Sequence, residues 1–421
     1  MLDLRWARQY KNKRTLFCQC ASDARKRQAE EGETKVLPQI AKVTEEQEIF
    51  RTALEGTVDR VSPVARAQEL DNAKRFDSEL HAALGELGIM GLGVPEELGG
   101  AGGGAVEQVL ALEVLGRKAT SMAVFIVVHF MITRLLRDYG SQAQQREHLV
   151  PLAQGQKAAS FCLTEAGGGT DILAAMKTKA RPEGNGWVLD GNKMWISGAS
   201  TSDIMVVLAR TGEHRSRGLS MFLVPTEAKG VAATELSTFA INGYDTNALT
   251  LEGVRVPAGA ILGVQDQGFP QVVATLNGER MNAAAVAIGI GRGAIEVTRD
   301  YALEREAFGK PIGQFQAVQT QLSTAGISVE SAWMMTLEAA RRDEAGEATD
   351  VLSSMAKWWS ARAAVQCTDT GMEIFAGAGF DTSLPIQRYY RDARLYSFAP
   401  LNQNMALNMV AERWLGFPRG F

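Results

Sequence analysis

The spacing of the apolar residues changes twice along this chain, and that change most constrains its fold. From about residue 44 to residue 154, apolar residues recur at helical spacings, and a loop rich in glycine interrupts them at 91–104. One helix face is predicted to carry Phe76, Leu80, Leu84, Leu87 and Met90. The first third of the chain is therefore expected to be helical.

The middle of the chain predicts strands. Runs rich in β-branched and aromatic residues, at 186–191, 204–209 and 218–224, alternate with Gly and Asn turns. Pro257 suits the end of the last strand better than its centre. After residue 269 the helical period returns, in the segments 271–304, 316–342 and 349–375.

These changes divide the chain into four parts. Residues 1–40 are expected to be a flexible basic extension, 41–155 a helical domain, 156–265 a central β-domain and 266–421 a helical domain. The basic extension has the character of a mitochondrial transit peptide, with a disordered tail or an upstream start codon as the alternatives. We expect a cytoplasmic protein, or one of the mitochondrial matrix if the extension is a transit peptide.

Composition excludes several classes of protein. The 421 residues are 46% hydrophobic and 22% charged, with a formal net charge of −4, as in soluble globular proteins that do not bind nucleic acid. The longest apolar run, 122–132, is too short for a membrane span, so none is expected. Four scattered cysteines and four isolated histidines predict a reducing compartment and no metal site.

Two motifs carry chemistry. The first is Thr164-Glu-Ala-Gly-Gly-Gly169-Thr170-Asp171, whose glycines let a ligand approach backbone N–H groups, although a turn between strands would explain them too. The second is Lys193-Met-Trp195-Ile-Ser197. There the indole could stack on a flat heterocycle, or it could belong to the core.

Together these motifs resemble the acyl-CoA dehydrogenase family, and the resemblance covers all but about the first 40 residues. Further matching segments are 94–100, 254–257, 305–311, 376–380 and 390–394. The resemblance implies an α+β multidomain fold with an N-terminal helical domain, a central β-barrel-like domain and a C-terminal four-helix bundle. It also implies a homotetramer of flavoprotein subunits, each with one FAD.

Site residues follow from the resemblance position by position. It implies FAD contacts at Phe161, Leu163, Thr164, Gly169, Thr170, Trp195, Ser197, Arg305, Phe308, Glu373, Gly377, Asn402 and Asn404, and substrate contacts at Thr170 and Arg280. Arg305 and Phe308 would reach the FAD of a neighbouring subunit, although a surface ion pair and a core position are the plain alternatives. Glu373, Asn402 and Asn404 depart from the family's usual residues.

The catalytic base is displaced relative to most of the family. Counting from Arg391-Asp392-Ala393, Pro400 stands where the usual catalytic Glu would be. A branch that includes isovaleryl-CoA dehydrogenase carries the Glu earlier, and this chain reads Leu276-Asn-Gly-Glu279-Arg280 there. Glu279 is therefore the expected base, with a Glu–Arg pair that fixes a helix as the alternative.

Pro400 has a second consequence. In the family the backbone N–H at that position helps to bind the thioester carbonyl, and proline has no N–H. Either a neighbouring N–H moves into place, or activation of the carbonyl is weak.

Three functions remain in competition. The leading one is FAD-dependent α,β-dehydrogenation of a fatty or branched-chain acyl-CoA, with Glu279 taking the proton, flavin N5 the hydride and an electron-transferring flavoprotein the electrons. Because of Pro400, the alternative is other chemistry on the same fold, by a monooxygenase, an oxidase or a C–S-cleaving lyase. The third is a non-catalytic relative that binds flavin or nucleic acid. The length and branching of the acyl chain stay open.

Overall fold

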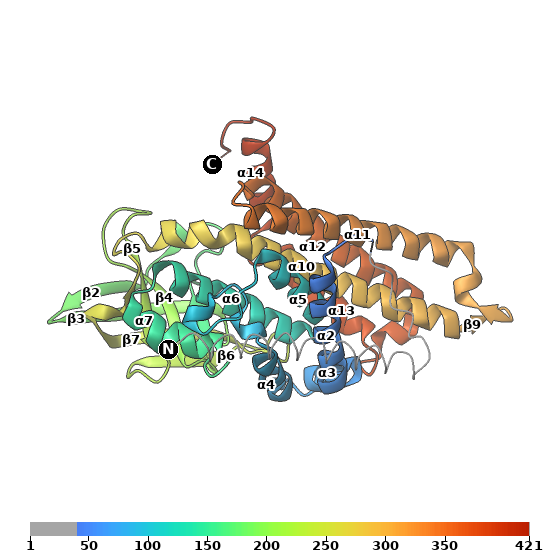
Figure 1. Ribbon diagram of the computed structural model, residues 1–421, viewed down its shortest axis with the longest axis horizontal. Helices are drawn as coiled ribbons and strands as arrows, with labels where there is room; N and C mark the ends of the chain where they lie inside the picture. The colour runs from blue at the N-terminus through green and yellow to red at the C-terminus, as the bar shows by residue number, and fades with distance from the viewer. Residues whose placement is uncertain (1–39, 421) are drawn as a thin grey trace. The chain divides into compact units, whose positions relative to one another are not determined.

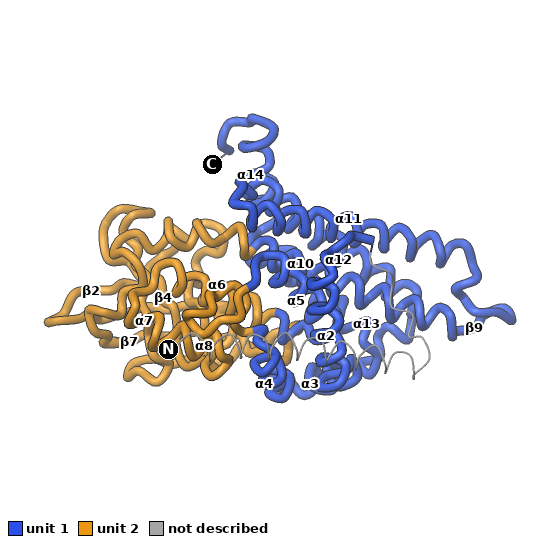
Figure 2. Tube along the Cα trace, viewed as in Figure 1, with its two compact units in different colours: residues 1–89, 103–123, 280–421 blue, residues 90–102, 124–279 orange. Residues whose placement is uncertain are grey.

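The structure is a computed structural model and describes residues 40–420 (Figure 1). It contains two compact units, each built from separate stretches of the chain (Figure 2). Unit 1 takes in residues up to 89, 103–123 and those from 280 onward, and unit 2 takes in 90–102 and 124–279. The division into four sequence segments stays a prediction, and the expected extension at 1–40 lies almost wholly outside the described residues.

The expected N-terminal helices are confirmed. The first, α2, begins with a capping box in which Thr44 and Gln47 satisfy each other's backbone N–H groups. The helices are α2 (Glu45–Val61), α3 (Val64–Asn72), α4 (Ser78–Leu87), α5 (Ala105–Lys118), α6 (Thr120–Tyr139), α7 (Gln142–Gln144) and α8 (Val150–Ala153).

The predicted helix face from Phe76 to Met90 is only partly correct. Leu80, Leu84 and Leu87 are buried on α4, but Asp77 caps that helix, so Phe76 precedes it and is exposed. Gly88 ends α4 in the left-handed conformation, which places Met90 in a separate short 3₁₀ turn, Ile89–Gly91. Cap chemistry at both ends of α4 therefore overrides the apolar spacing.

The expected β-domain is confirmed as an eight-stranded sheet in unit 2. The spatial order of seven strands is β6-β7-β3-β2-β4-β5-β8, and β1 pairs with β4 in parallel. Pro257 ends β7, as its missing N–H predicts. The strands are β1 (Ala159–Cys162), β2 (Lys179–Glu183), β3 (Gly186–Ser197), β4 (Ile204–Arg210), β5 (Leu219–Pro225), β6 (Val231–Glu235), β7 (Thr246–Pro257) and β8 (Ile261–Leu262).

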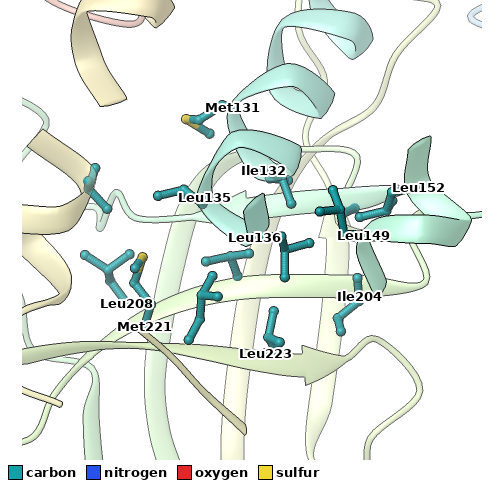
Figure 3. Packing of buried hydrophobic residues seen from close by; sticks show 14 of the residues in the cluster. Met131, Ile132, Leu135, Leu136, Leu149, Leu152, Ile204, Leu208, Met221 and Leu223 are labelled. Carbon is teal, nitrogen blue, oxygen red and sulfur yellow. The ribbon is translucent and has the colours of Figure 1, made fainter. Parts of the chain in front are cut away.

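The central strands β4 and β5 are buried on both faces, and successive side chains enter two different cores. Along β4, Val206 and Leu208 pack in a cluster with Leu135 and Leu136 of α6 (Figure 3). The residues between them belong to a second cluster with β3 and β7. This burial on both faces explains why β4 reads as one continuous apolar run.

The C-terminal helices are confirmed close to their expected limits. Within unit 1, α11 packs on α12, and α12 packs on α13 and α14. Gly346 takes a positive φ in the turn between α11 and α12. The elements are α10 (Gly268–Glu304), β9 (Glu306–Ala307), β10 (Lys310–Pro311), α11 (Gln316–Glu344), α12 (Asp350–Phe375), α13 (Ile386–Ala393) and α14 (Gln403–Arg413).

One helix among residues 40–420, α6, is long and apolar enough to cross a membrane by length and composition alone. The expectation from sequence counted only the apolar run 122–132, which contains His129, so as a length argument it was wrong. In the structure 72% of the most apolar window of α6 is buried. Such burial is typical of a core helix.

Candidate active site

The glycine motif forms the loop that follows β1. This loop runs from the buried end of the strand to α9 (Ile172–Ala175), whose first turn is capped by the carboxylate of Asp171. Phe161, Leu163 and Thr164 are half-buried at its start, whereas Gly169 and Thr170 are exposed. A Cβ built on Gly169 would meet no atom within 4 Å, so the backbone there is open to a ligand.

The tryptophan motif lies at a β-bulge in β3. Pairing with β7 shifts register between Lys193 and Ile196, and Trp195 takes a φ of 62° in the bulge. The indole is 62% exposed, so Trp195 is not a core residue. Ser197 is half-buried two residues further along β3. A left-handed conformation at a non-glycine residue is uncommon and tends to occur at functional positions.

A backbone hydrogen bond brings the two motifs together. The N–H of Met194, inside the bulge, donates to the carbonyl oxygen of Thr164 at 2.9 Å. The bulge frees this N–H from the ladder with β7, and the loop after β1 receives it. Thr164 and Trp195, predicted from separate motifs, therefore belong to one surface of unit 2.

A buried ion pair lies beneath this surface. Lys193 is 1% exposed, and its Nζ lies 3.0 Å from Glu165 Oε1 and 3.2 Å from the carbonyl oxygen of Leu163. The two carboxylate oxygens of Glu165 also accept the backbone N–H groups of Lys177 and Thr178, at 2.7 and 3.0 Å. One pair of side chains thus joins the glycine loop, β3 and the start of β2.

Burial and partners act in opposite directions on this pair. Burial lowers the pKa of Lys193, while Glu165 pulls it upward. Burial alone would raise the pKa of Glu165, but Lys193 and the two backbone donors outweigh it, so that pKa lies below its usual value. The partners therefore favour the charged form of each side chain, against the cost of burial. Both residues stand in the two motifs, but no role for either was predicted from the sequence.

The expected base, Glu279, is half-buried on α10. The residue before it, Gly278, is buried, and a Cβ there would collide with Nη1 of Arg134 on α6. The guanidinium of Arg134 therefore lies against the α10 backbone at Gly278. The next residue, Arg280, is 7% exposed and belongs to unit 1.

Two of the expected FAD contacts in unit 1 lie on the hairpin β9–β10. Arg305 is exposed at its start, and Phe308 is 96% exposed with a φ of 54°. Phe308 is therefore not a core residue, and the ring meets Phe315 edge-on with the centroids 6.1 Å apart. A phenyl ring presented to solvent on a strained backbone is suited to contact another molecule.

Other expected FAD contacts lie along the second half of unit 1. Glu373 and Gly377 are exposed near the end of α12, and a Cβ on Gly377 would meet no atom within 4 Å. Asn402 caps α14, because its Oδ1 accepts the backbone N–H of Asn404 at 2.8 Å. Capping of α14 thus already occupies the side-chain oxygen of Asn402.

The turn that contains Pro400 is held by a lysine that sequence reasoning missed. Lys357 on α12 is 1% exposed, and its Nζ donates to the carbonyl oxygens of Tyr396 at 2.9 Å and Leu401 at 2.5 Å. Burial lowers the pKa of Lys357 to about 8. Among residues 40–420 no carboxylate pairs with it. The signal in the sequence was one lysine inside an otherwise uncharged stretch of helix.

Taken separately, each unit contains residues whose chemistry fits the flavin dinucleotide that the resemblance implies. Open backbone at Gly169 and Gly377 leaves room for phosphate or ring atoms, and the exposed indole of Trp195 offers an aromatic surface. Arg305 supplies a cation suited to phosphate. Within the described part of the chain, no group of three or more His, Cys, Asp or Glu side chains is placed to hold a metal ion.

Comparison with known families identifies the family of the chain. Three family models match in order: the acyl-CoA dehydrogenase N-terminal domain at residues 44–156, the middle domain at 160–254 and the C-terminal domain at 266–415. Among curated relatives, the short-chain specific acyl-CoA dehydrogenase of Clostridium acetobutylicum is 32% identical over 357 residues, which are 84% of this chain and 93% of the relative.

Two solved structures show the same fold. A glutaryl-CoA dehydrogenase from Mycobacterium smegmatis in complex with FADH2 has a TM-score of 0.84 and 26% identity, with 90% of this chain and 96% of that chain covered. A chain from a study of the electron transferring flavoprotein of Acidaminococcus fermentans has a TM-score of 0.86 and 27% identity, with 89% and 99% covered. The chain therefore belongs to the acyl-CoA dehydrogenase family and is an FAD-dependent oxidoreductase of that family.

Proposed function

We propose that this enzyme removes the α-proton of an acyl-CoA thioester with the carboxylate of Glu279. The observation that carries the proposal is the placement of Glu279, half-buried on α10 at the position where the resemblance implies the base. The ionised carboxylate is the form that accepts a proton. Position 400, where most of the family carries its acid, is a proline here.

The remaining parts of the reaction follow from the family. Bound FAD supplies the acceptor, at flavin N5, for the hydride that leaves the β-carbon. The surface formed by Thr164 and Trp195 would hold the ring, and the buried Lys193–Glu165 pair would keep that surface rigid. Arg280 would bind the phosphate-bearing part of CoA, since a guanidinium suits phosphate.

Partners and assembly are part of the same proposal. The exposed Phe308 and Arg305 support a homotetramer in which this hairpin reaches the FAD of another subunit. An electron-transferring flavoprotein would take the electrons, in keeping with the similarity to the Acidaminococcus fermentans structure. We place the enzyme in the cytoplasm, or in the mitochondrial matrix if the basic N-terminus directs it there.

The test is anaerobic mixing of the holoenzyme with short, branched and long acyl-CoAs while the visible flavin absorbance is followed. We expect one class to bleach the flavin, and Glu279→Gln to slow bleaching by roughly 10²–10⁴-fold while FAD stays bound. Glu304→Gln, an exposed change at the other end of α10, is the control and should bleach at the normal rate. Normal bleaching in Glu279→Gln would rule out the assignment.

Pro400 favours a second candidate function, oxygen-dependent or C–S-cleaving chemistry on the same fold. A proline at this position removes one donor to the thioester carbonyl, a loss that costs roughly 3–4 kcal/mol in oxyanion sites. Rapid reaction of the reduced flavin with O₂, without bleaching by any acyl-CoA, would support this alternative. Slow reaction with O₂ and clean bleaching would support the dehydrogenase.

A further inference from the structure

The exposed part of the glycine motif is a short strap between two fixed points. The strap, residues 166–171, contains three glycines and one charged residue, Asp171. Directly before it, Glu165 is 8% exposed and belongs to a buried ion pair. Directly after it, Ile172 and Leu173 pack against the hydrophobic cluster that includes β4. The glycines therefore allow the strap to change conformation while both of its ends stay in place.

A loop between β4 and β5 supports the strap. This brace loop, residues 211–217, is organised by Arg210, whose guanidinium donates to the carbonyl oxygen of His214 at 3.1 Å. The Nδ1 atom of His214 accepts two backbone N–H groups of the same loop, at 3.3 and 2.9 Å. Arg210 also donates to the carbonyl oxygen of Leu173, at 3.2 Å. One guanidinium thus joins the brace loop to the backbone just after the strap.

One exposed ion pair joins the brace loop to the strap itself. Arg215 Nη2 lies 2.7 Å from Asp171 Oδ1, and the two side chains are 64% and 63% exposed. A pair this exposed contributes little free energy and weakens as the salt concentration rises. The pair of Lys193 and Glu165 at the base of the loop is buried and is screened much less. The strap is therefore held firmly at its base and only weakly along its exposed length.

We propose that the strap is a gate for the flavin dinucleotide and that the pair of Arg215 and Asp171 is the latch that keeps it closed. The inference rests on the proposed contact between the glycine loop and FAD. When the pair forms, the strap lies against α9, where a Cβ on Gly168 would stand only 2.5 Å from the Ala175 Cβ. When the pair separates, the strap moves away from α9 and opens the path to the dinucleotide. Arg215 is thus a positioning residue.

The first test compares two arginines of the brace loop. Arg215→Gln removes the latch, whereas Arg217→Gln removes the same charge from the same loop, and among the described residues no acid pairs with Arg217. We expect FAD to leave the holoenzyme about two- to five-fold faster in Arg215→Gln, and at the wild-type rate in Arg217→Gln. The fluorescence of free FAD after dilution measures release. Equal rates in the two variants would overturn the proposal.

The second test asks whether the two charges act as a pair. Asp171→Asn removes the charge but keeps the side-chain oxygen that caps α9. We expect it to speed release as much as Arg215→Gln does, and the double variant to add nothing to either single change. The difference from wild type should also disappear at about 1 M salt, where the Debye length is roughly 3 Å. Additive effects, or a difference that persists in high salt, would reject the latch.

A third measurement follows the strap without any substrate. We expect the backbone amides of 166–171 in the holoenzyme to exchange hydrogen about two- to five-fold faster in Arg215→Gln than in wild type, with exchange in β4 unchanged. Equal exchange in both proteins would reject movement of the strap.

These measurements also separate the gate from the proposed function, because neither FAD release nor hydrogen exchange needs an acyl-CoA. Release controlled by the latch, in an enzyme that no acyl-CoA bleaches, would reject the dehydrogenase and keep the gate. Clean bleaching together with release that ignores the latch would reject the gate alone.

Discussion

Each unit contains one buried lysine beneath candidate site residues, and the two lysines differ in what balances their charge. In unit 2, Lys193 contacts the carboxylate of Glu165 beneath the glycine loop. In unit 1, Lys357 contacts only backbone carbonyls beneath the turn that contains Pro400. Both are 1% exposed, so neither charge is balanced by water.

The difference shows what each lysine contributes. An ion pair stays charged in the interior, but it depends on both of its members. A lone lysine has no charged partner whose removal would leave it uncompensated. Its burial lowers its pKa instead, to about 8 for Lys357. The surface formed by Thr164 and Trp195 is thus held by a pair that fails if either residue is changed. The turn that contains Pro400 is held by a residue that can be removed at a lower cost in stability.

The largest expected effect comes from separating the pair. Glu165→Gln leaves Lys193 buried without a carboxylate, and we expect a loss of about 3–5 kcal/mol in the free energy of unfolding. Glu183→Gln, an exposed acid on β2, is the control and should change it by less than about 1 kcal/mol. Chemical denaturation measures both.

A double variant sharpens the interpretation of that result. Glu165→Leu with Lys193→Met replaces both charges with apolar side chains, and it should recover most of the loss seen in Glu165→Gln. If Glu165→Gln costs less than about 1 kcal/mol, Lys193 is not held as a buried cation and the contrast between the two lysines disappears.

The next effect concerns pH and the lone lysine. Because the folded protein lowers the pKa of Lys357 from 10.5 to about 8, the unfolded chain holds this proton more strongly between those values. The buried charge of Lys357 therefore lowers the free energy of unfolding below pH 8. This loss diminishes as the pH rises from about 8 toward 10.5. Relative to Lys357→Met, wild type should gain on the order of 2 kcal/mol between pH 7 and pH 9.5. A difference that stays constant with pH would mean that Lys357 does not titrate in this window.

The smallest expected change in stability distinguishes two roles for glycine in the loop after β1, namely close packing and access for a ligand. A Cβ at Gly168 would lie 2.5 Å from the Ala175 Cβ, so Gly168→Ala should cost about 1–3 kcal/mol. A Cβ at Gly169 meets nothing within 4 Å, so Gly169→Ala should change unfolding by less than about 0.5 kcal/mol. If the backbone of Gly169 meets the flavin, only Gly169→Ala should weaken FAD binding without loss of stability. Unchanged FAD affinity would remove Gly169 from the site.

Sequence reasoning reached the residues that touch solvent and missed those that hold them. Thr164, Gly169 and Trp195 stand in recognisable motifs, and the structure places Thr164 and Trp195 together through the Met194 N–H. Lys193 and Lys357 were missed as anchors because their partners lie 28 to 44 residues away in the chain. No local sequence pattern predicts a contact between residues so far apart in the chain.

The errors have the same origin. The apolar spacing from Phe76 to Met90 suggested one helix, but Asp77 and Gly88 cap α4 inside that stretch. The apolar run 122–132 was shorter than α6, because scattered polar residues do not keep a helix from being long and buried. Local hydrogen bonding and burial determine where a helix begins and ends.

By itself, the sequence determined the order of helical and β segments, the family and the loss of an acid at position 400, because these depend on local periodicity and residue identity. Only the tertiary structure decided which backbone groups the buried lysines hold, and which way the Leu401–Asn402 peptide points. A buried lysine holds the backbone in place, because an ammonium group removed from water must form its hydrogen bonds to groups of the protein.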